Sequence, residues 1–160
     1  MKYILVDIDG VLTDGRVLMD INSNETKAIN YRDLDAISIG RKAGYDFMFV
    51  TGENTEMVKI LAKRFNVEIV YSNQKDKLAA MNNISEEYGI PLNELICIGD
   101  SDRDAPALEA VGLGIAPRDA SKNAQATADV ITDCNGGYGV LLEAVSNIIS
   151  GKWYPKAGNL

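Results

Sequence analysis

Two aspartates near the start of the chain, Asp7 and Asp9, have the type and spacing that a catalytic pair of carboxylates requires. They follow the apolar run at residues 3–6, which is typical of a buried strand, and Gly10 then indicates a turn. Ligands of open α/β sheets bind at the carboxyl ends of the strands, so both side chains can face one crevice. One carboxylate could attack an electrophilic centre such as phosphorus while the other transfers a proton.

Further polar residues follow two later apolar runs. Thr51 comes directly after residues 47–50, and Asp100 and Asp104 come after residues 95–98. Parallel strands bring these ends to one edge of a sheet, where the carboxylates would repel one another and raise one another's pKa values. A hard cation would relieve this repulsion, and Mg²⁺, which prefers oxygen ligands, is the cofactor that we expect.

Two lysines provide a second indication of the chemistry. Lys75 and Lys77 lie in the first turn of a predicted helix, where the helix dipole disfavours cations. A bound anion would explain at least one of them, and solvated lysines offset by Asp76 are the alternative. With Mg²⁺, Lys77 and Thr51 on the phosphoryl oxygens, the pattern predicts a phosphoryl-transfer site that needs no histidine, and the chain has none.

Alternating apolar runs and amphipathic segments predict the elements that position these residues. We expect an α/β fold with a doubly wound, Rossmann-like parallel sheet and helices on both faces. Strands are predicted at residues 3–6, 47–50, 67–71, 95–98, 113–116 and 128–131, and helices at 33–43, 57–65, 75–88, 105–111, 121–127 and 140–149.

The segment between the first strand and the first helix predicts a small flap. Residues 21–24 have turn chemistry between two extended segments, which is typical of a β-hairpin, here at about residues 16–31. This leaves no room for a cap domain. With 160 residues and 46% hydrophobic content we expect a single domain at residues 1–150, followed by a tail at 151–160 that is either disordered or docked.

The composition of the chain limits its partners and its location. The net charge of −7 argues against nucleic-acid or acidic-membrane partners, which need clustered Lys and Arg. No apolar run approaches about 18 residues and no leader is apparent, so we expect neither a membrane span nor a signal peptide. Two distant cysteines fit a reducing compartment, and the cytoplasm is the expected location. The absence of histidine excludes a Ser-His-Asp triad and His-ligated zinc.

The order of these motifs resembles that of the haloacid dehalogenase superfamily. The matching motifs are Asp-x-Asp-Gly-Val-x-Thr-Asp from Asp7, Thr51-Gly52, the downstream Lys77, and Gly-Asp-Ser-x-x-Asp ending at Asp104. The resemblance covers nearly the whole chain and is strongest to the capless phosphatases of 3-deoxy-octulosonate 8-phosphate and nonulosonate 9-phosphates. It implies a cytoplasmic phosphatase for an acidic sugar phosphate of lipopolysaccharide or sialic acid biosynthesis.

The resemblance also implies a role for each matching residue. Asp7 would be the nucleophile that forms an aspartyl-phosphate, and Asp9 would be the general acid and base. Mg²⁺ would be bound by Asp7, the backbone carbonyl of Asp9, and Asp100. Asp104 would orient the metal's surroundings or the lysine, beside Ser101, which stands where close relatives often have aspartate. The phosphate-binding residues would be Thr51, Gly52 and Lys77.

Residues outside these motifs are the candidates for substrate recognition and for contacts between subunits. Glu53, Arg32 and Arg64 are candidate substrate-binding residues. Glu53 could meet sugar hydroxyls, whereas Arg64 could meet a substrate carboxylate across a subunit interface or be a solvated helix residue. The resemblance implies a homotetramer in which a neighbour's flap and its tail, with Trp153 and Tyr154, help to close each site.

Parts of the sequence are also compatible with four other kinds of protein. Cys97 and Arg103 have the spacing of cysteine-based phosphatases, but Cys97 lies inside an apolar strand and the acidic loop would repel a phosphate dianion. A receiver module would accept phosphate on an aspartate after the third strand, where residues 71–73 contain none. A non-catalytic regulatory or assembly domain, related to nucleotide-sugar synthetase partners, stays open as the alternative. A dinucleotide site is disfavoured because no Gly-x-Gly-x-x-Gly follows the first strand.

Overall fold

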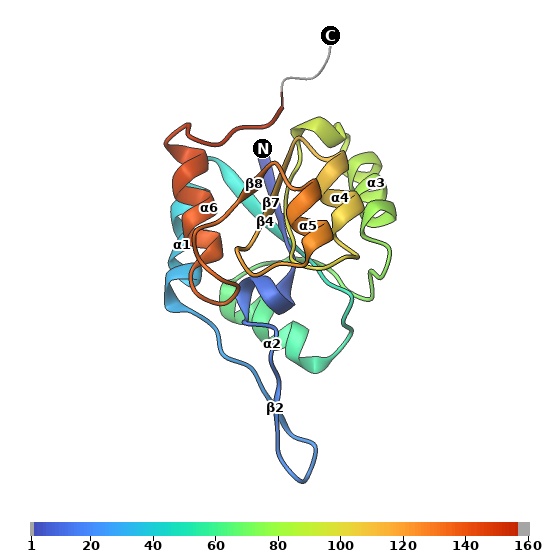
Figure 1. Cartoon of the computed structure of the whole chain (residues 1–160), viewed down its shortest axis with the longest axis vertical. Coiled ribbons are helices and arrows are strands. Elements are labelled where there is room, and N and C mark those ends of the chain that lie inside the picture. Colours follow the sequence, from blue (N-terminus) through green and yellow to red (C-terminus); the bar gives the residue numbers. More distant parts are fainter. Residues whose placement is uncertain (1, 157–160) are drawn as a thin grey trace.

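Short runs of buried aliphatic residues form a six-stranded parallel sheet at the centre of the molecule (Figure 1). The computed structural model describes residues 2–156. The strand order is β5-β4-β1-β6-β7-β8, so β1 lies inside the sheet between β4 and β6. The strands are β1 (Lys2–Val6), β4 (Tyr45–Val50), β5 (Ile69–Tyr71), β6 (Ile96–Ile98), β7 (Leu113–Ala116) and β8 (Val130–Ile131).

Helices cover both faces of the sheet, which confirms the predicted doubly wound α/β fold. Alternate side chains of β1 enter different cores: Ile4 and Val6 pack in one, and Leu5 packs in the other. The first core is closed by α1 (Tyr31–Lys42), α2 (Glu56–Phe65) and α6 (Val140–Ile149). The second is closed by α3 (Lys77–Tyr88), α4 (Ala105–Ala110) and α5 (Lys122–Thr127), with the short 3-10 turn η2 (Leu92–Glu94) beside it.

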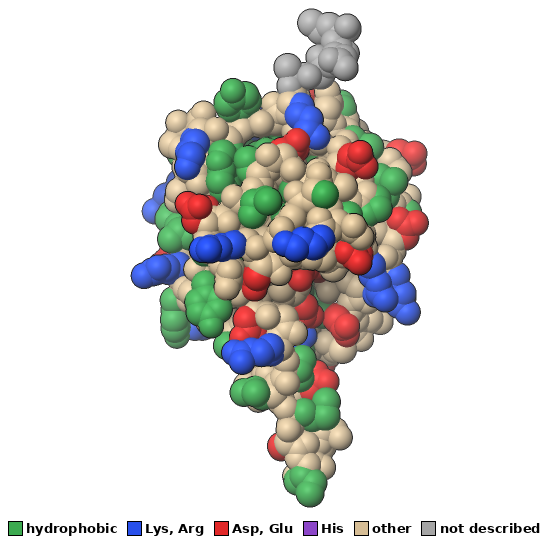
Figure 2. Space-filling view, in the orientation of Figure 1, with side chains coloured by type: hydrophobic (Ala, Val, Ile, Leu, Met, Phe, Trp, Pro, Cys, Tyr) green, Lys and Arg blue, Asp and Glu red, His purple; other side chains and the backbone are tan. Residues whose placement is uncertain are grey.

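The predicted flap is a two-stranded antiparallel hairpin of β2 (Leu18–Met19) and β3 (Glu25–Thr26) that projects from the body (Figure 1). Its turn is held by the carboxylate of Asp20, which accepts hydrogen bonds from the backbone of Asn22 and Asn24. The hairpin exposes several apolar side chains to solvent, and Figure 2 shows this apolar surface at the foot of the molecule. They are Val17, Leu18, Met19 and Ile21, the last of which is 98% exposed.

The tail docks on its own chain as far as the structure describes it, and residues 157–160 of the predicted tail lie outside the described residues. Trp153 is buried in the first core. Lys156 donates its backbone N–H to Gly112 and pairs through Nζ with Asp129 at 2.9 Å. These contacts lie at the amino ends of β7 and β8, at the opposite end of the molecule from the flap (Figure 1).

A buried carboxylate connects the first and last helices. Asp33 of α1 is fully buried, and its Oδ1 accepts a hydrogen bond of 3.1 Å from the backbone N–H of Leu142, in the first turn of α6. Gly139 precedes that helix and has no side chain to cap it, so the Asp33 carboxylate caps the helix N-terminus instead. Its Oδ2 has no hydrogen-bond partner. Burial outweighs the backbone hydrogen bonds and raises the pKa of Asp33 to about 6.

Asp33 is expected to make the free energy of unfolding fall as the pH rises from about 4 to 6. The Asp33 carboxyl keeps its proton up to about pH 6 in the folded protein but ionises near pH 3.8 in the unfolded protein. Between these pH values deprotonation stabilises the unfolded state relative to the folded state. Asp33→Asn should remove this loss, which is about 1–3 kcal/mol. Urea unfolding at several pH values measures it, with the exposed Asp35→Asn as control. An equal difference between Asp33→Asn and wild type at pH 4 and pH 7 would contradict the raised pKa.

Candidate active site

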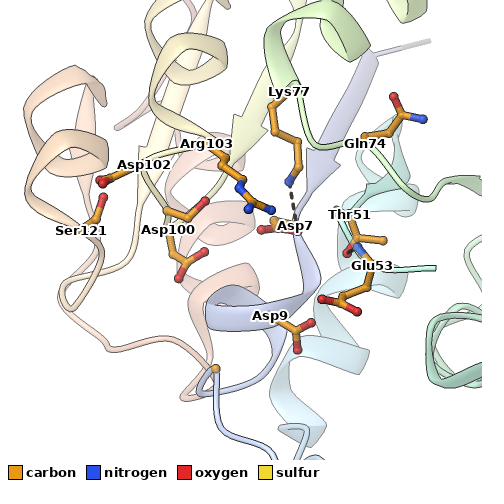
Figure 3. A pocket seen from close by; sticks show the side chains of 13 residues that line it. Asp7, Asp9, Thr51, Glu53, Gln74, Lys77, Asp100, Asp102, Arg103 and Ser121 are labelled. Atoms are coloured by element: carbon orange, nitrogen blue, oxygen red, sulfur yellow. Dashed lines mark hydrogen bonds and ion pairs between the residues drawn. The ribbon is translucent and has the colours of Figure 1, made fainter. Parts of the chain in front are cut away.

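A cavity of about 540 Å³ opens where the carboxyl ends of β1, β4 and β6 meet (Figure 3). This is the edge of the sheet at which the sequence predicted the site. Because the strands are parallel, side chains that are distant in sequence surround one space. Eight of the predicted site residues line it: Asp7, Asp9, Thr51, Gly52, Glu53, Lys77, Asp100 and Ser101.

Glycines let the loops around this cavity approach each other. Gly10 has a φ of +84°, and a Cβ there would lie 1.9 Å from Oδ2 of Asp100. Its own carbonyl oxygen lies 2.0 Å from where a Cβ on Gly136 would be. No side chain fits at either position without moving the backbone or the Asp100 carboxylate. The turn after β1 is therefore packed between the loop after β6 and the loop before α6.

Lys77 is the centre of a buried charge network. Its Nζ donates to the carbonyl of Val50 at 2.9 Å and to Oδ1 of Asp104 at 2.8 Å, and it lies 3.1 Å from Oδ1 of Asp7. Burial lowers the pKa of an amine, but these two carboxylates outweigh it and raise the pKa of Lys77 above its usual range. The anions that explain a lysine in this first turn are thus carboxylates of the chain, while Lys75 precedes the helix and is exposed.

Three carboxylates lie together beside this lysine. One oxygen from each of Asp7, Asp100 and Asp104 lies within 4.8 Å of the others. Burial raises the pKa values of Asp7 and Asp100 to about 7, against the opposing charge of Lys77 and with support from Asp104. The mutual repulsion expected from the sequence is therefore present. Such a set of hard oxygen ligands fits a divalent cation.

Asp104 differs from the other two carboxylates because both its oxygens already have partners. Oδ1 accepts from Lys77, and Oδ2 accepts from the hydroxyl and backbone N–H of Ser101 at 2.7 and 2.9 Å. This arrangement fits the orienting role that the resemblance implied. Of these three carboxylates, Asp7 and Asp100 line the cavity, and the third predicted metal ligand is the backbone carbonyl of Asp9.

The Asp9 side chain is turned away from this cluster and toward the flap. Lys27, just after β3, donates from Nζ to both carboxylate oxygens of Asp9 at 2.7 and 2.9 Å. The hydroxyl of Thr13 donates to Oδ1 at 3.2 Å. The pairing with Lys27 could not be predicted from the sequence, because the contact exists only when the hairpin folds back over its own base.

The remaining substrate candidates separate into two groups. Glu53 lines the cavity, but Arg32 and Arg64 do not. Arg32 lines a neighbouring groove at the base of the flap, and Arg64 donates to the hydroxyl of Tyr31 at 3.2 Å. Arg103, Gln74 and Ser121 line the cavity and were not predicted as site residues. Arg103 could have been predicted as a site residue, because it directly precedes Asp104 in the sequence.

The structure argues against a cysteine-based phosphatase. Cys97 is buried in β6, and burial, supported by the nearby Asp104 carboxylate, raises the pKa of its thiol to about 12. A cysteine-based phosphatase needs a thiolate, so that reading is wrong. Residues 2–156 form no helix with the length and apolar character that crossing a bilayer requires.

A doubly wound sheet that presents carboxylates and a buried lysine at its carboxyl edge defines a class of protein. Proteins of this class bind a divalent cation and an anionic group together, and the adjacent aspartates suit phosphoryl chemistry. The comparisons with known proteins agree with this class. Residues 60–143 match the model of the haloacid dehalogenase-like hydrolases.

Similarity to individual proteins extends over most of the chain. The 3-deoxy-D-manno-octulosonate 8-phosphate phosphatase KdsC of Salmonella typhi is 31% identical over 143 residues, which cover 89% of this chain and 76% of the relative. The enzyme of the same name from Yersinia pestis is 28% identical, with coverage of 93% and 80%. The chain belongs to the haloacid dehalogenase-like hydrolase family, as the motifs indicated.

A solved structure agrees closely with the fold. The 3-deoxy-D-manno-octulosonate 8-phosphate phosphatase of Moraxella catarrhalis superposes with a TM-score of 0.89 at 29% identity, covering 94% of this chain and 86% of the other. That protein was crystallised with a magnesium ion, a phosphate ion and a KDO molecule.

Proposed function

We propose that this protein is a Mg²⁺-dependent phosphatase that hydrolyses an acidic sugar phosphate through an aspartyl-phosphate intermediate. The observation that carries the proposal is the buried Lys77, which joins Asp7 to Asp104 beside Asp100 at the floor of one cavity. The substrate would be of the 3-deoxy-octulosonate 8-phosphate or nonulosonate 9-phosphate type. The similarity to KdsC proteins supports the first of these.

The reaction would proceed in two displacements. Asp7 attacks phosphorus, and the bond from phosphorus to the sugar oxygen breaks. Asp9, which must enter this step in its protonated form, gives that oxygen its proton. Asp9 then takes a proton from water as the water oxygen attacks the phosphorus of the aspartyl-phosphate. The bond between phosphorus and Asp7 breaks, so phosphate leaves and both carboxyl groups return to their starting states.

Mg²⁺ fits the residues that face the cavity. Asp7 and Asp100 offer hard oxygen ligands. Burial, with the neighbouring carboxylates adding to it, raises the pKa values of both groups, and a bound cation would favour their charged forms. The backbone carbonyl of Asp9 would complete the protein's ligands. When bound, the ion would offset the charge of the phosphoryl group and of the carboxylates that approach it.

Thr51, Gly52, Lys77 and Arg103 would bind the phosphoryl group. The Nζ atom of Lys77 already has Val50, Asp104 and Asp7 as partners, so the main role of Lys77 would be to fix the nucleophile and to add positive charge. Arg103 has no carboxylate partner within residues 2–156, and Figure 3 shows its guanidinium directed toward Asp7. Its planar donors suit phosphate oxygens.

The proposed enzyme is one phosphatase domain at residues 1–150 that assembles as a homotetramer. The apolar side chains exposed on the flap favour burial against another copy of the chain. The described part of the tail, up to Lys156, lies at the amino ends of β7 and β8 and not at the carboxyl ends where the cavity opens. We therefore assign its contribution to a neighbour's site. Arg32 and Arg64, which do not line the cavity of their own chain, would also act across this interface.

Phosphate release from a panel of substrates tests the proposed function. The panel contains 2-keto-3-deoxy sugar phosphates and simple phosphate esters, each assayed with Mg²⁺ and with excess chelator. We expect turnover of the acidic sugar phosphates that the chelator abolishes. Release of phosphate from none of them would reject the phosphatase and favour a regulatory or assembly domain.

A further inference from the structure

We propose that Lys27 of the flap is a positioning residue for Asp9, so that the flap controls protonation of the leaving group. The inference rests on the proposed function, because it assumes that Asp9 is the proton carrier. It concerns a residue outside the strand-end motifs. Its basis is a pair of charge-assisted hydrogen bonds that link the flap to the turn after β1.

The contact is buried on the lysine side. The Lys27 side chain is 8% exposed, and its Nζ lies 2.7 and 2.9 Å from the two oxygens of Asp9. A buried ammonium needs a compensating charge, and Asp9 is its carboxylate partner. The lysine is 18 residues away in sequence, directly after β3, the strand that returns from the tip of the flap.

Asp9 is also held from the other side of the flap base. The hydroxyl of Thr13, which is fully buried, donates to Oδ1 of Asp9. The same hydroxyl oxygen accepts from the backbone N–H groups of Gly10 and Gly15 at 3.4 and 3.2 Å. The chain entering the flap and the chain leaving it therefore both contact one carboxylate. A movement of the flap would move the carboxyl group with it.

The position of this carboxyl group matters most for a poor leaving group. The alkoxide of a sugar is a strong base and must be protonated as it leaves, whereas a nitrophenolate leaves without help. An error of about 1 Å in the position of a catalytic group can reduce the rate about 100-fold. Loss of Lys27 frees Asp9 to rotate, so it should slow the reaction of sugar phosphates and spare aryl phosphates.

The test compares a sugar phosphate with p-nitrophenyl phosphate in the presence of Mg²⁺. Lys27→Met should lower kcat/KM for the sugar phosphate by about 10- to 100-fold and leave the aryl ester within about 3-fold. Lys27→Arg should recover most of the loss because it keeps the charge. Lys59→Met is the matched control, since that lysine makes only an exposed ion pair with Glu56 on α2.

Asp9→Asn provides the reference pattern. It should lower kcat/KM for the sugar phosphate more than Lys27→Met does, and again spare the aryl ester. Adding Lys27→Met to Asp9→Asn should change these values little. Equal losses by Lys27→Met on both substrates, or no loss on either, would overturn the positioning role while the wild type stays active. If Asp9→Asn does not discriminate, the proton-carrier assignment fails instead. The flap lies outside both cores, and thermal unfolding of each variant verifies the fold.

Discussion

Asp7→Asn is expected to reduce phosphate release by about 10⁴-fold or more, because the amide cannot form the aspartyl-phosphate. The loss should appear in kcat with both sugar and aryl phosphates, since every ester requires the nucleophile. The variant should still bind Mg²⁺ and inorganic phosphate, because Asp100, Thr51 and Lys77 remain. Steady-state kinetics and calorimetric titration with phosphate measure these two properties. An active Asp7→Asn enzyme would reject the mechanism.

The same substitution should stabilise the metal-free protein at neutral pH. Burial raises the pKa of Asp7 to about 7, with Asp104 and Asp100 adding to the rise against the charge of Lys77. Ionisation of this carboxyl therefore costs stability as the pH rises from about 4 to 7, and asparagine avoids that cost. Asp7→Asn should unfold at a higher temperature than the wild type at pH 8 in chelator, with a smaller difference at pH 4. The exposed Asp35→Asn should show no such difference.

The sequence was sufficient to predict the sheet and the location of the site. Continuous apolar runs such as residues 47–50 become central strands, and the acidic residues after them necessarily meet at one edge. The helix at Val140–Ile149 has the predicted bounds because its apolar spacing is strong. Short strands were predicted less well. The third strand begins at Ile69, and residue 67 lies in the first core outside the sheet.

Contacts between distant polar residues could not be predicted. Asp33 caps the helix that begins at Val140, 109 residues away from its partner Leu142, and only the packing of two helices brings them together. The pairing of Lys27 with Asp9 depends likewise on how the hairpin folds back. The charge of a side chain does not show which distant residue it will contact in the fold. A single sequence therefore identifies such charged residues but not their partners.

Lys77→Met is expected to have the largest effect on stability, together with a loss of activity of about 10³-fold or more. Removing the ammonium leaves the buried Asp104, the mostly buried Asp7 and the carbonyl of Val50 without their common partner. Breaking a buried ion pair on one side costs about 3–5 kcal/mol. Urea unfolding in chelator measures the cost. The exposed Lys75→Met, two residues earlier, is the matched control and should change the free energy of unfolding by less than about 0.5 kcal/mol.

Two additions separate the structural part of Lys77 from its catalytic part. Asp104→Asn combined with Lys77→Met should be more stable than the sum of the single effects predicts, by about 1 kcal/mol or more, because the second change removes a charge that the first left unpaired. Saturating Mg²⁺ should recover part of the stability of Lys77→Met by offsetting the remaining carboxylates, but not its activity. A divalent cation near Asp100 cannot replace the hydrogen bond that holds Asp104, nor the charge on the Asp7 side of the phosphoryl group. Full recovery of activity by Mg²⁺ would contradict this division of roles.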